Sequence, residues 1–424
     1  MSGLHLKVGA GAAEIAFPAE FFPTECFCGV HDAPHIRVLL FDQKIRFALV
    51  VAELINIPPE GLELCKREIS RIVRTTKENV WVHITHAIST PHDPLDSMPP
   101  FIPVDHDAPK KHEWFFNSIK NAACEAATKA LESLCPAKVS IGKTLCDVNI
   151  NRDVETPFGW WIGEGGTGPS NRQLTTLNFT AVDGNPIAVL VSYGIKPCAL
   201  DRAGIMTGTR LVSADVPGKA CRILEDKLGV PVIFCMSAAG DQVPREQALK
   251  EWVDSEGNIQ RADLGVECGL EIVNRLGTEM AQDVEKALLV EQVVSTEPYM
   301  ATAASEFSWP CKRRTQMRPM LVSNYLVERM GTVSLQVFRM GDIAFVTSMS
   351  EINYETERQL YELSPCPCTI LLSMTNGLFR YMPEQSAYER FTWEAQSSAL
   401  MPGAAERFVD EACKLISDIG NGRK

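Results

Sequence analysis

Short apolar runs rich in β-branched residues recur along this chain of 424 residues, and tight glycine turns or stretches of helical periodicity separate them. Such runs predict buried β-strands, and the 3.6-residue periodicity predicts helices that cover them. The expected strands span residues 35–42, 46–52, 80–86, 138–147, 174–182, 186–193, 231–236, 333–339, 342–348 and 369–374. The expected helices span residues 59–74, 111–134, 212–228, 264–287, 353–362 and 403–419.

The connections between these segments predict the fold class. Asp183-Gly184-Asn185 and Met340-Gly341-Asp342 join two strands directly, which is typical of antiparallel hairpins. Elsewhere a helix separates two strands, and this favours parallel crossovers. We therefore expect an α/β fold with layered, mixed β-sheets flanked by helices. Residues 1–424 should form a single domain, because no linker rich in Pro, Ser and Gly divides them.

The segment 156–172 is rich in glycine and aromatic residues and includes the pair Trp160-Trp161. Long loops are often functional, so this segment is either an active-site lid or a plain surface loop. It matches a phosphate-binding loop poorly, since no strand precedes it and no helix clearly follows.

Composition and charge exclude several classes of protein. Hydrophobic residues make up 45% of the chain and charged residues 22%, which excludes a disordered, collagen-like or coiled-coil protein. The net charge of −12 argues against nucleic acid or an anionic membrane as a partner. No apolar run approaches the ~20 residues of a membrane span, and the N-terminus lacks the pattern of a signal peptide. The expected partner is a small-molecule substrate, and the sequence leaves the oligomeric state open.

The 14 cysteines are too few for a disulfide scaffold in a chain of this length, and none forms a Cys-x-x-Cys pair. We therefore expect free thiols in a reducing compartment, and hence a cytoplasmic protein. No motif indicates a nucleotide or flavin cofactor.

All 8 histidines lie between His5 and His112, so a metal site that uses imidazoles must draw them from this part of the chain. His86 and His92 are the best pair, because the expected strand ends near His86 and the chain then turns back. His83 should face the opposite side of the strand from His86. Such histidines are plausible metal ligands or acid–base groups, and hydrogen-bonded loop histidines are the alternative.

Polar side chains follow one expected strand after another. The carboxyl ends of parallel strands gather at one edge of an α/β sheet, where ligands bind. We therefore expect these side chains to converge on one pocket despite their separation along the chain. They are His86, Lys196, Asp241, Glu351 and Tyr381.

Three arginines lie near these segments and could bind a substrate carboxylate in bidentate fashion. They are Arg172, Arg202 and Arg245. The alternative is that they are solvated surface residues. Asp241 also has a structural alternative, because it could cap the turn that follows it.

Several motifs are informative through their order and spacing. They are Gly29-Val30-His31-Asp32, Thr85-His86-Ala87-Ile88-Ser89-Thr90-Pro91, Ser213-Ala214-Asp215-Val216-Pro217-Gly218, Ser237-Ala238-Ala239-Gly240-Asp241, Ser350-Glu351 and Asn376-Gly377-Leu378-Phe379-Arg380-Tyr381. In this order they resemble segments of the catalytic N-terminal domain of neutral ceramidases, which are zinc-dependent amidases that cleave an N-acyl bond. The resemblance runs from Val8 to the last expected helix and implies the same fold.

The resemblance also implies a site. The zinc ligands of the family are two histidines, a glutamate and a tyrosine, and His86, Glu351 and Tyr381 match three of them. Lys196 stands where the second histidine is expected. An ammonium group has no lone pair to offer a metal. Val243 stands where the family has its nucleophilic serine.

Three functions are compatible with these residues. In the first, the chain is an amidohydrolase-like enzyme in which zinc-activated water attacks the substrate. In the second, no metal binds, and Lys196 is the central acid, base or imine-forming group of an isomerase, epimerase or lyase. In the third, the chain is a non-catalytic binding protein. The proposed metal ligands are His86, His92 and Glu351, and the proposed catalytic residues are Lys196, Asp241 and Tyr381.

Two arguments bear on these alternatives. A relic site has no reason to keep ionisable groups that are costly to bury, and this disfavours the binding protein. A cytosolic chain without an apolar membrane segment has no means of extracting a lipid. A small polar amide or a related carbonyl compound therefore fits better than ceramide.

Overall fold

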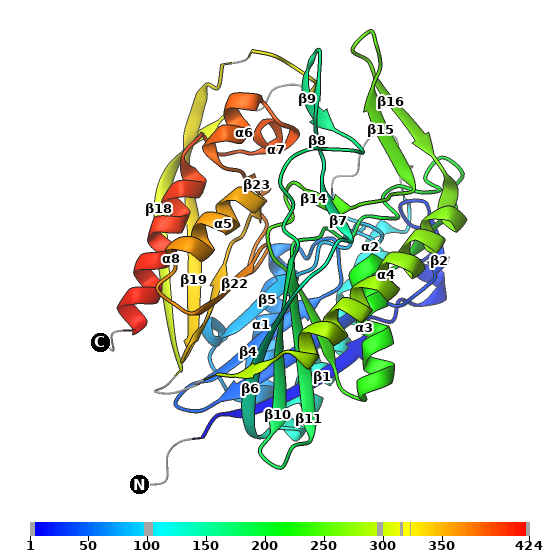
Figure 1. Ribbon diagram of the computed structural model, residues 1–424. Coiled ribbons are helices and arrows are strands. Elements are labelled where there is room, and N and C mark those ends of the chain that lie inside the picture. The colour runs from blue at the N-terminus through cyan, green and yellow to red at the C-terminus, as the bar shows by residue number, and fades with distance from the viewer. Residues whose placement is uncertain (1–4, 97–104, 295–299, 314–316, 323, 421–424) are drawn as a thin grey trace.

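The computed structural model describes residues 5–96, 105–294, 300–313, 317–322 and 324–420. Helices form the two outer layers, and two packed β-sheets lie between them (Figure 1). This arrangement confirms the predicted α/β fold with layered, mixed sheets and flanking helices.

The larger sheet has nine strands in the order β13-β11-β10-β6-β1-β3-β4-β5, with β17 beside β6. The pairs β11–β13 and β4–β5 are parallel, and the other pairs are antiparallel. Its strands are β1 (Lys7–Glu14), β3 (His35–Asp42), β4 (Arg46–Ala52), β5 (Val80–Ile84), β6 (Cys135–Leu145), β10 (Gln173–Ala181), β11 (Pro186–Tyr193), β13 (Val232–Met236) and β17 (Gln292–Val293).

Side chains alternate between the two faces of this sheet, and both faces are buried. In β3, Val38 and Leu40 pack in the core under the helices, whereas Leu39 and Phe41 pack against the second sheet. Burial on both faces explains why these strands are continuous apolar runs in the sequence.

Four long helices cover one face of the larger sheet. They are α1 (Pro59–Val73), α2 (Ala108–Glu132), α3 (Asp215–Leu228) and α4 (Gly265–Leu289). Gly9 and Gly11 allow α2 to approach β1 closely, because a Cβ atom at either position would overlap the helix backbone. Among the described residues, no helix combines the length and apolar character needed to cross a membrane.

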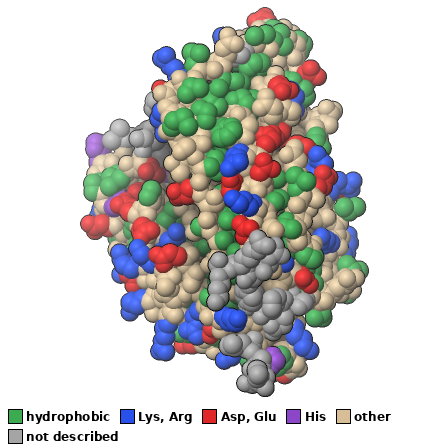
Figure 2. All heavy atoms as spheres, turned by 90° about the vertical axis from the view of Figure 1, so that its left-hand side faces the viewer, with side chains coloured by type: hydrophobic (Ala, Val, Ile, Leu, Met, Phe, Trp, Pro, Cys, Tyr) green, Lys and Arg blue, Asp and Glu red, His purple; other side chains and the backbone are tan. Residues whose placement is uncertain are grey.

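The second sheet packs on the opposite face and has the order β18-β19-β20-β22. Its strands are β18 (Met300–Lys312), β19 (Val327–Met340), β20 (Ile343–Thr347) and β22 (Cys368–Leu372). The outer helices α5 (Tyr354–Leu363) and α8 (Ala404–Gly420) cover it. Figure 2 shows the face beside α8 and β18, where charged side chains of both signs lie across the middle and hydrophobic ones gather towards one end.

Short elements at one end of the sheets complete the fold (Figure 1). The strands are β2 (Phe27–Val30), β7 (Asn149–Asn151), β8 (Asp153–Thr156), β9 (Gly159–Ile162), β12 (Arg210–Val212), β14 (Gln242–Pro244), β15 (Leu249–Val253), β16 (Ile259–Asp263), β21 (Glu351–Ile352) and β23 (Tyr381–Met382). The helices are α6 (Gln385–Arg390) and α7 (Trp393–Ser397).

Several boundaries from the sequence need correction. The strand expected at 80–86 ends at Ile84, because the backbone turns into the left-handed region at His86 (φ 58°). The segment expected as one loop, 156–172, contains β9, which pairs with β8 in a hairpin. β1 and β18 were not expected. The two predicted glycine hairpins, β10–β11 and β19–β20, are antiparallel as expected.

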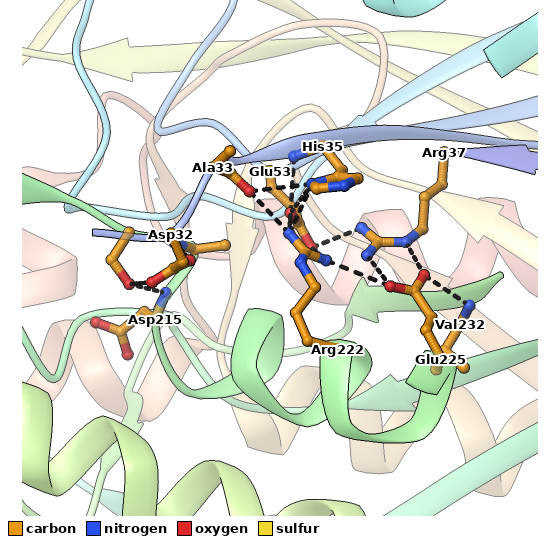
Figure 3. A network of polar contacts seen from close by, with 11 residues as sticks. Asp32, Ala33, His35, Arg37, Glu53, Asp215, Arg222, Glu225 and Val232 are labelled. Carbon is orange, nitrogen blue, oxygen red and sulfur yellow. Dashed lines mark hydrogen bonds and ion pairs between the residues drawn. The ribbon is translucent and has the colours of Figure 1, made fainter. Parts of the chain in front are cut away.

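A buried charge network joins α3 to the larger sheet (Figure 3). Arg37 is 1% exposed, and it pairs with Glu53 at 2.6 Å and with Glu225 at 2.8 Å. Arg222 reaches Glu53 at 2.7 Å, and the backbone N–H groups of His35 and Val232 donate to the same two carboxylates. Each charge therefore has an opposite charge and further hydrogen bonds.

Candidate active site

A cavity of about 270 Å³ lies at the end of the sheets where the hairpins β8–β9 and β15–β16 stand side by side (Figure 1). Side chains from strand ends form its inner part, and the two hairpins supply part of its rim. It is lined by Ile55, His86, Ile88, Arg152, Ile162, Gly163, Glu164, Lys196, Cys198, Asp201, Arg202, Val243, Gln247, Leu249, Glu251, Tyr381 and Trp393.

Lys196 is buried and follows β11, where its backbone N–H donates to the carbonyl of Gln242 at 3.1 Å. Its ammonium Nζ lies 2.5 Å from Glu351 Oε2 and donates a hydrogen bond to the Tyr381 hydroxyl at 2.7 Å. Lys196 is thus the link between a carboxylate and a phenol.

Glu351 and Tyr381 are placed side by side by backbone pairing. The short strands β21 and β23 are parallel, and Glu351 is the direct register partner of Tyr381. The Glu351 N–H also donates to the carbonyl of Arg380 at 2.7 Å. Residues 30 positions apart in the chain are therefore fixed next to each other by the sheet rather than by a shared loop.

His86 completes this group from the opposite side. Its Nδ1 lies 2.7 Å from the Ile55 carbonyl, so Nδ1 carries the proton and Nε2 keeps a lone pair. Nε2 is 3.4 Å from Glu351 Oε1. The left-handed backbone at His86 directs the ring, and non-glycine residues adopt that conformation mostly at special sites.

Arg152 lies behind the Tyr381 ring and is held by Glu394. Its Nε and Nη2 donate to Glu394 Oε1 at 2.7 and 2.5 Å, and Nη2 also reaches the Tyr381 hydroxyl at 3.4 Å. The guanidinium carbon lies 4.8 Å from the centre of the Trp393 ring. Two cations, Lys196 and Arg152, therefore donate to the oxygen of Tyr381.

Burial and neighbouring charges set the protonation states of the site. Burial alone would lower the pKa of Lys196, but Glu351 and then Tyr381 outweigh it and raise that pKa above its ordinary value. Burial would raise the pKa of Glu351, but Lys196 and His86 bring it below its ordinary value. Burial lowers the pKa of His86, against the opposing effect of Glu351. At neutral pH the site holds an ammonium, a carboxylate and a neutral imidazole.

The structure brings four of the five expected site residues together: His86, Lys196, Glu351 and Tyr381. Asp241 lies outside the cavity, where its carboxylate accepts hydrogen bonds from Tyr354 N–H and Asn151 Nδ2. Burial, followed by Glu384, raises the pKa of Asp241 to about 7.

His92 is not brought to Glu351. Its Nδ1 lies 2.8 Å from Glu25 Oε2, and its backbone N–H donates to the same carboxylate. Of the three arginines, Arg202 lines the cavity, with long contacts of 3.3 Å to Asp201. Arg172 pairs with Asp147 on the surface and Arg245 with Glu279, and neither lines the cavity.

Sequence reasoning missed the pair Arg152 and Glu394. Arg152 lies between the short strands β7 and β8, which have no apolar run to mark them. Glu394 lies in the short helix α7. Thr392, whose side chain accepts a hydrogen bond from the Ala395 N–H, is the N-cap of this helix and was the available sequence signal for its start.

A zinc ion does not fit the residues of this site. The Lys196 ammonium already lies against both Glu351 and Tyr381, which the family resemblance would make zinc ligands. A dication held by the same two oxygens would face a protonated amine within a few ångströms, and that amine has no lone pair to offer. The ammonium supplies the positive charge at this place.

Comparison with known proteins supports the fold independently of the motifs. No protein-family model matches the chain, and no curated protein matches its sequence. Among solved structures, a ceramidase complexed with C2 superposes with a TM-score of 0.73 at 13% identity, covering 99% of this chain and 76% of the other. Neutral ceramidase from Pseudomonas aeruginosa gives a TM-score of 0.72 at 13% identity, covering 99% and 75%. This chain therefore has the neutral ceramidase fold, as its motifs predicted.

Proposed function

We propose that the chain is an amidohydrolase-like enzyme that hydrolyses a small polar amide or a related carbonyl compound in this cavity, without a catalytic metal. The observation that carries the proposal is the position of Lys196 Nζ, 2.5 Å from Glu351 and 2.7 Å from the Tyr381 hydroxyl. The shared fold with two ceramidases supports the reaction class.

Tyr381 is the proposed donor to the substrate carbonyl. Its oxygen accepts hydrogen bonds from Lys196 and Arg152, and no acceptor among the described residues takes its proton. That proton is free to bind the oxygen of a substrate in the cavity. The two cations strengthen the phenol as a donor when negative charge develops on the substrate oxygen, which is the main requirement of acyl transfer.

His86 is the proposed general base. Its Nε2 lone pair can take a proton from a water that attacks the carbonyl carbon, and the same proton can then pass to the leaving amine. Glu351, 3.4 Å from Nε2, stabilises the imidazolium that forms between the two steps. Water is the proposed nucleophile because Val243 has no hydroxyl and because burial, followed by Asp215, raises the pKa of the lining Cys198 thiol well above its ordinary value.

The cavity favours a compact polar substrate. A volume of about 270 Å³ suits a small molecule better than a lipid with two long chains. The long contacts between Arg202 and Asp201 leave the guanidinium free to exchange its partner for a substrate carboxylate.

The test combines a substrate panel with chelation. N-acyl amino acids and small primary amides are incubated with the protein in excess chelator, and amine release is measured. We expect hydrolysis to persist in chelator. In Lys196→Met, kcat/KM should fall by an amount that corresponds to about 2–4 kcal/mol of transition-state stabilisation, the usual cost of losing one preorganised donor. Lys196→Arg should not restore it, because a planar fork does not replace a compact ammonium. Activity that requires added metal, or full activity in Lys196→Met, contradicts the proposal.

A second candidate is proton transfer next to a carbonyl, as in an isomerase or epimerase. The absence of a hydroxyl at Val243 favours it, since an acid and a base face the cavity and no side-chain nucleophile is needed. The raised pKa of Lys196 disfavours imine formation, because the free amine is scarce at neutral pH. Exchange of a carbon-bound proton with deuterated water, without amine release, would favour this candidate.

A further inference from the structure

Three metal-ligating side chains meet outside the catalytic cavity. Glu60, Asp93 and His112 each offer one ligand atom, and these atoms lie within 4.8 Å of one another. In the described part of the chain, no other three Asp, Glu, His or Cys side chains come as close. None of the three lines the catalytic cavity.

Separate elements hold these ligands in place. Glu60 lies in the first turn of α1 and His112 in α2, and the two helices pack against each other. Asp93 lies in the loop that follows β5 and is 3% exposed. Its Oδ1 is 2.8 Å from His112 Nδ1 and accepts from the Leu95 N–H at 3.1 Å. The ring of His112 packs against Phe116, so its orientation is restricted.

The carboxylates of the cluster lack a permanently charged partner among the described residues. Among the described residues, no lysine or arginine forms an ion pair with Glu60 or Asp93, and the imidazole beside Asp93 is that of His112. A buried carboxylate without a fixed cation is costly unless a proton or a metal ion compensates it.

We propose that Glu60, Asp93 and His112 bind one Zn²⁺ ion and that solvent completes its coordination. Zinc takes nitrogen and oxygen ligands at about 2.0–2.2 Å, so its ligand atoms must approach within about 4.2 Å of one another. The three ligand atoms already lie within 4.8 Å of one another, so small adjustments of the three side chains bring them to this separation. One imidazole with two carboxylates suits zinc, whereas Ca²⁺ and Mg²⁺ prefer oxygen ligands alone.

The ion ties the starts of α1 and α2 to the loop between β5 and α2, which also carries His86. Its role is therefore to stabilise the support of the catalytic base, and no catalytic step passes through it. Because protons compete with a metal ion for imidazole and carboxylate ligand atoms, binding weakens as the pH falls.

The experiment measures zinc binding to the full chain by isothermal titration calorimetry after metal removal, with Zn²⁺ as the probe. We expect one equivalent to bind wild type. His112→Gln and Asp93→Asn should each weaken zinc binding by at least about tenfold. Losing a residue that only orients a metal ligand already costs about tenfold in affinity, so losing a ligand should cost no less. Glu60→Gln should also weaken binding, and because Glu60 is exposed we expect this variant to fold as wild type does.

Two control variants locate the ion. His92→Gln removes a neighbouring imidazole that pairs with Glu25, and His86→Gln removes the imidazole of the catalytic cavity. Both should bind zinc as wild type does. The proposal is overturned if wild type binds no zinc, if Glu60→Gln and Asp93→Asn both bind it unchanged, or if His86→Gln loses it. Since binding is measured without a substrate, failure here is separate from failure of the proposed hydrolysis.

Discussion

The catalytic cavity and the buried network of Figure 3 both contain cations and carboxylates removed from solvent, yet they are built differently. In the network, Arg37 and Arg222 bridge Glu53 and Glu225, and backbone N–H groups complete the carboxylates. In the cavity, Lys196 and Arg152 converge on the oxygen of Tyr381, and no described residue accepts the proton of this hydroxyl.

The difference teaches how to separate structural from functional buried charge. A buried ion pair is poor evidence for either stability or function by itself, because desolvation can cancel its attraction. A buried charged group whose hydrogen-bonding atoms all have partners within the protein is expected to have a structural role. Donors that point at a cavity indicate that the missing partner is a ligand.

The largest expected effect is on stability and tests the structural half of the comparison. Arg37→Met leaves Glu53 and Glu225 short of charge in a dry environment and should lower the free energy of unfolding by about 3–5 kcal/mol. Lys196→Met should cost clearly less, because His86, 3.4 Å from Glu351, can take up a proton and partly compensate the carboxylate that loses its ammonium partner. Urea denaturation of both variants measures the difference. Equal losses would break the distinction between the two regions.

A smaller effect concerns His83, a buried titratable group that forms no ion pair with any residue in the described part of the chain. Its Nε2 accepts from the Met236 N–H at 2.9 Å and its Nδ1 lies 3.0 Å from Thr375 Oγ1, and burial lowers its pKa from 6.5 to about 3. Below pH 6.5 the unfolded chain gains a proton that the folded chain refuses, so stability is present above pH 6.5 and is lost as the pH falls. From this group the slope is about 1.4 kcal/mol per pH unit.

Urea denaturation between pH 7 and pH 5 measures this slope. We expect about 2 kcal/mol of stability to disappear between pH 6.5 and 5 through His83. The variant His83→Gln should lose that part of the dependence whatever its stability at pH 7. If the free energy of unfolding changes equally with pH in wild type and variant, the effect comes from other titratable groups and not from His83.

The smallest expected effect concerns substrate binding in the catalytic cavity, and its measurement requires a substrate. Arg202→Gln should raise KM for an anionic substrate by roughly tenfold, since a charged hydrogen bond is lost. The matched control is Arg172→Gln, which should change KM by less than about twofold, because exposed ion pairs contribute little. The two arginines differ in place: Arg202 lines the cavity, and Arg172 pairs with Asp147 on the surface. Equal effects on KM would mean that Arg202 does not contact substrate.

The sequence by itself determined most strands of the two large sheets, the long helices and much of the candidate site, because these depend on local patterns. Apolar runs placed β3, β4 and β11 at their observed bounds, and helical periodicity placed α1 and α5 within one residue. Polar residues that follow strands placed His86, Lys196 and Tyr381. Motif order predicted the neutral ceramidase fold, although overall identity to the solved structures is only 13%.

Only the tertiary structure decided which candidates meet. Asp241 follows β13 as Lys196 follows β11, but its carboxylate bonds to Asn151 and Tyr354 instead of facing the cavity. His92 follows His86 closely, yet Glu25 holds it elsewhere. Arg152 and Glu394 are 242 positions apart and meet through packing. The physical reason is that strand ends follow from local side-chain patterns, whereas the direction of a side chain beyond a strand depends on distant partners.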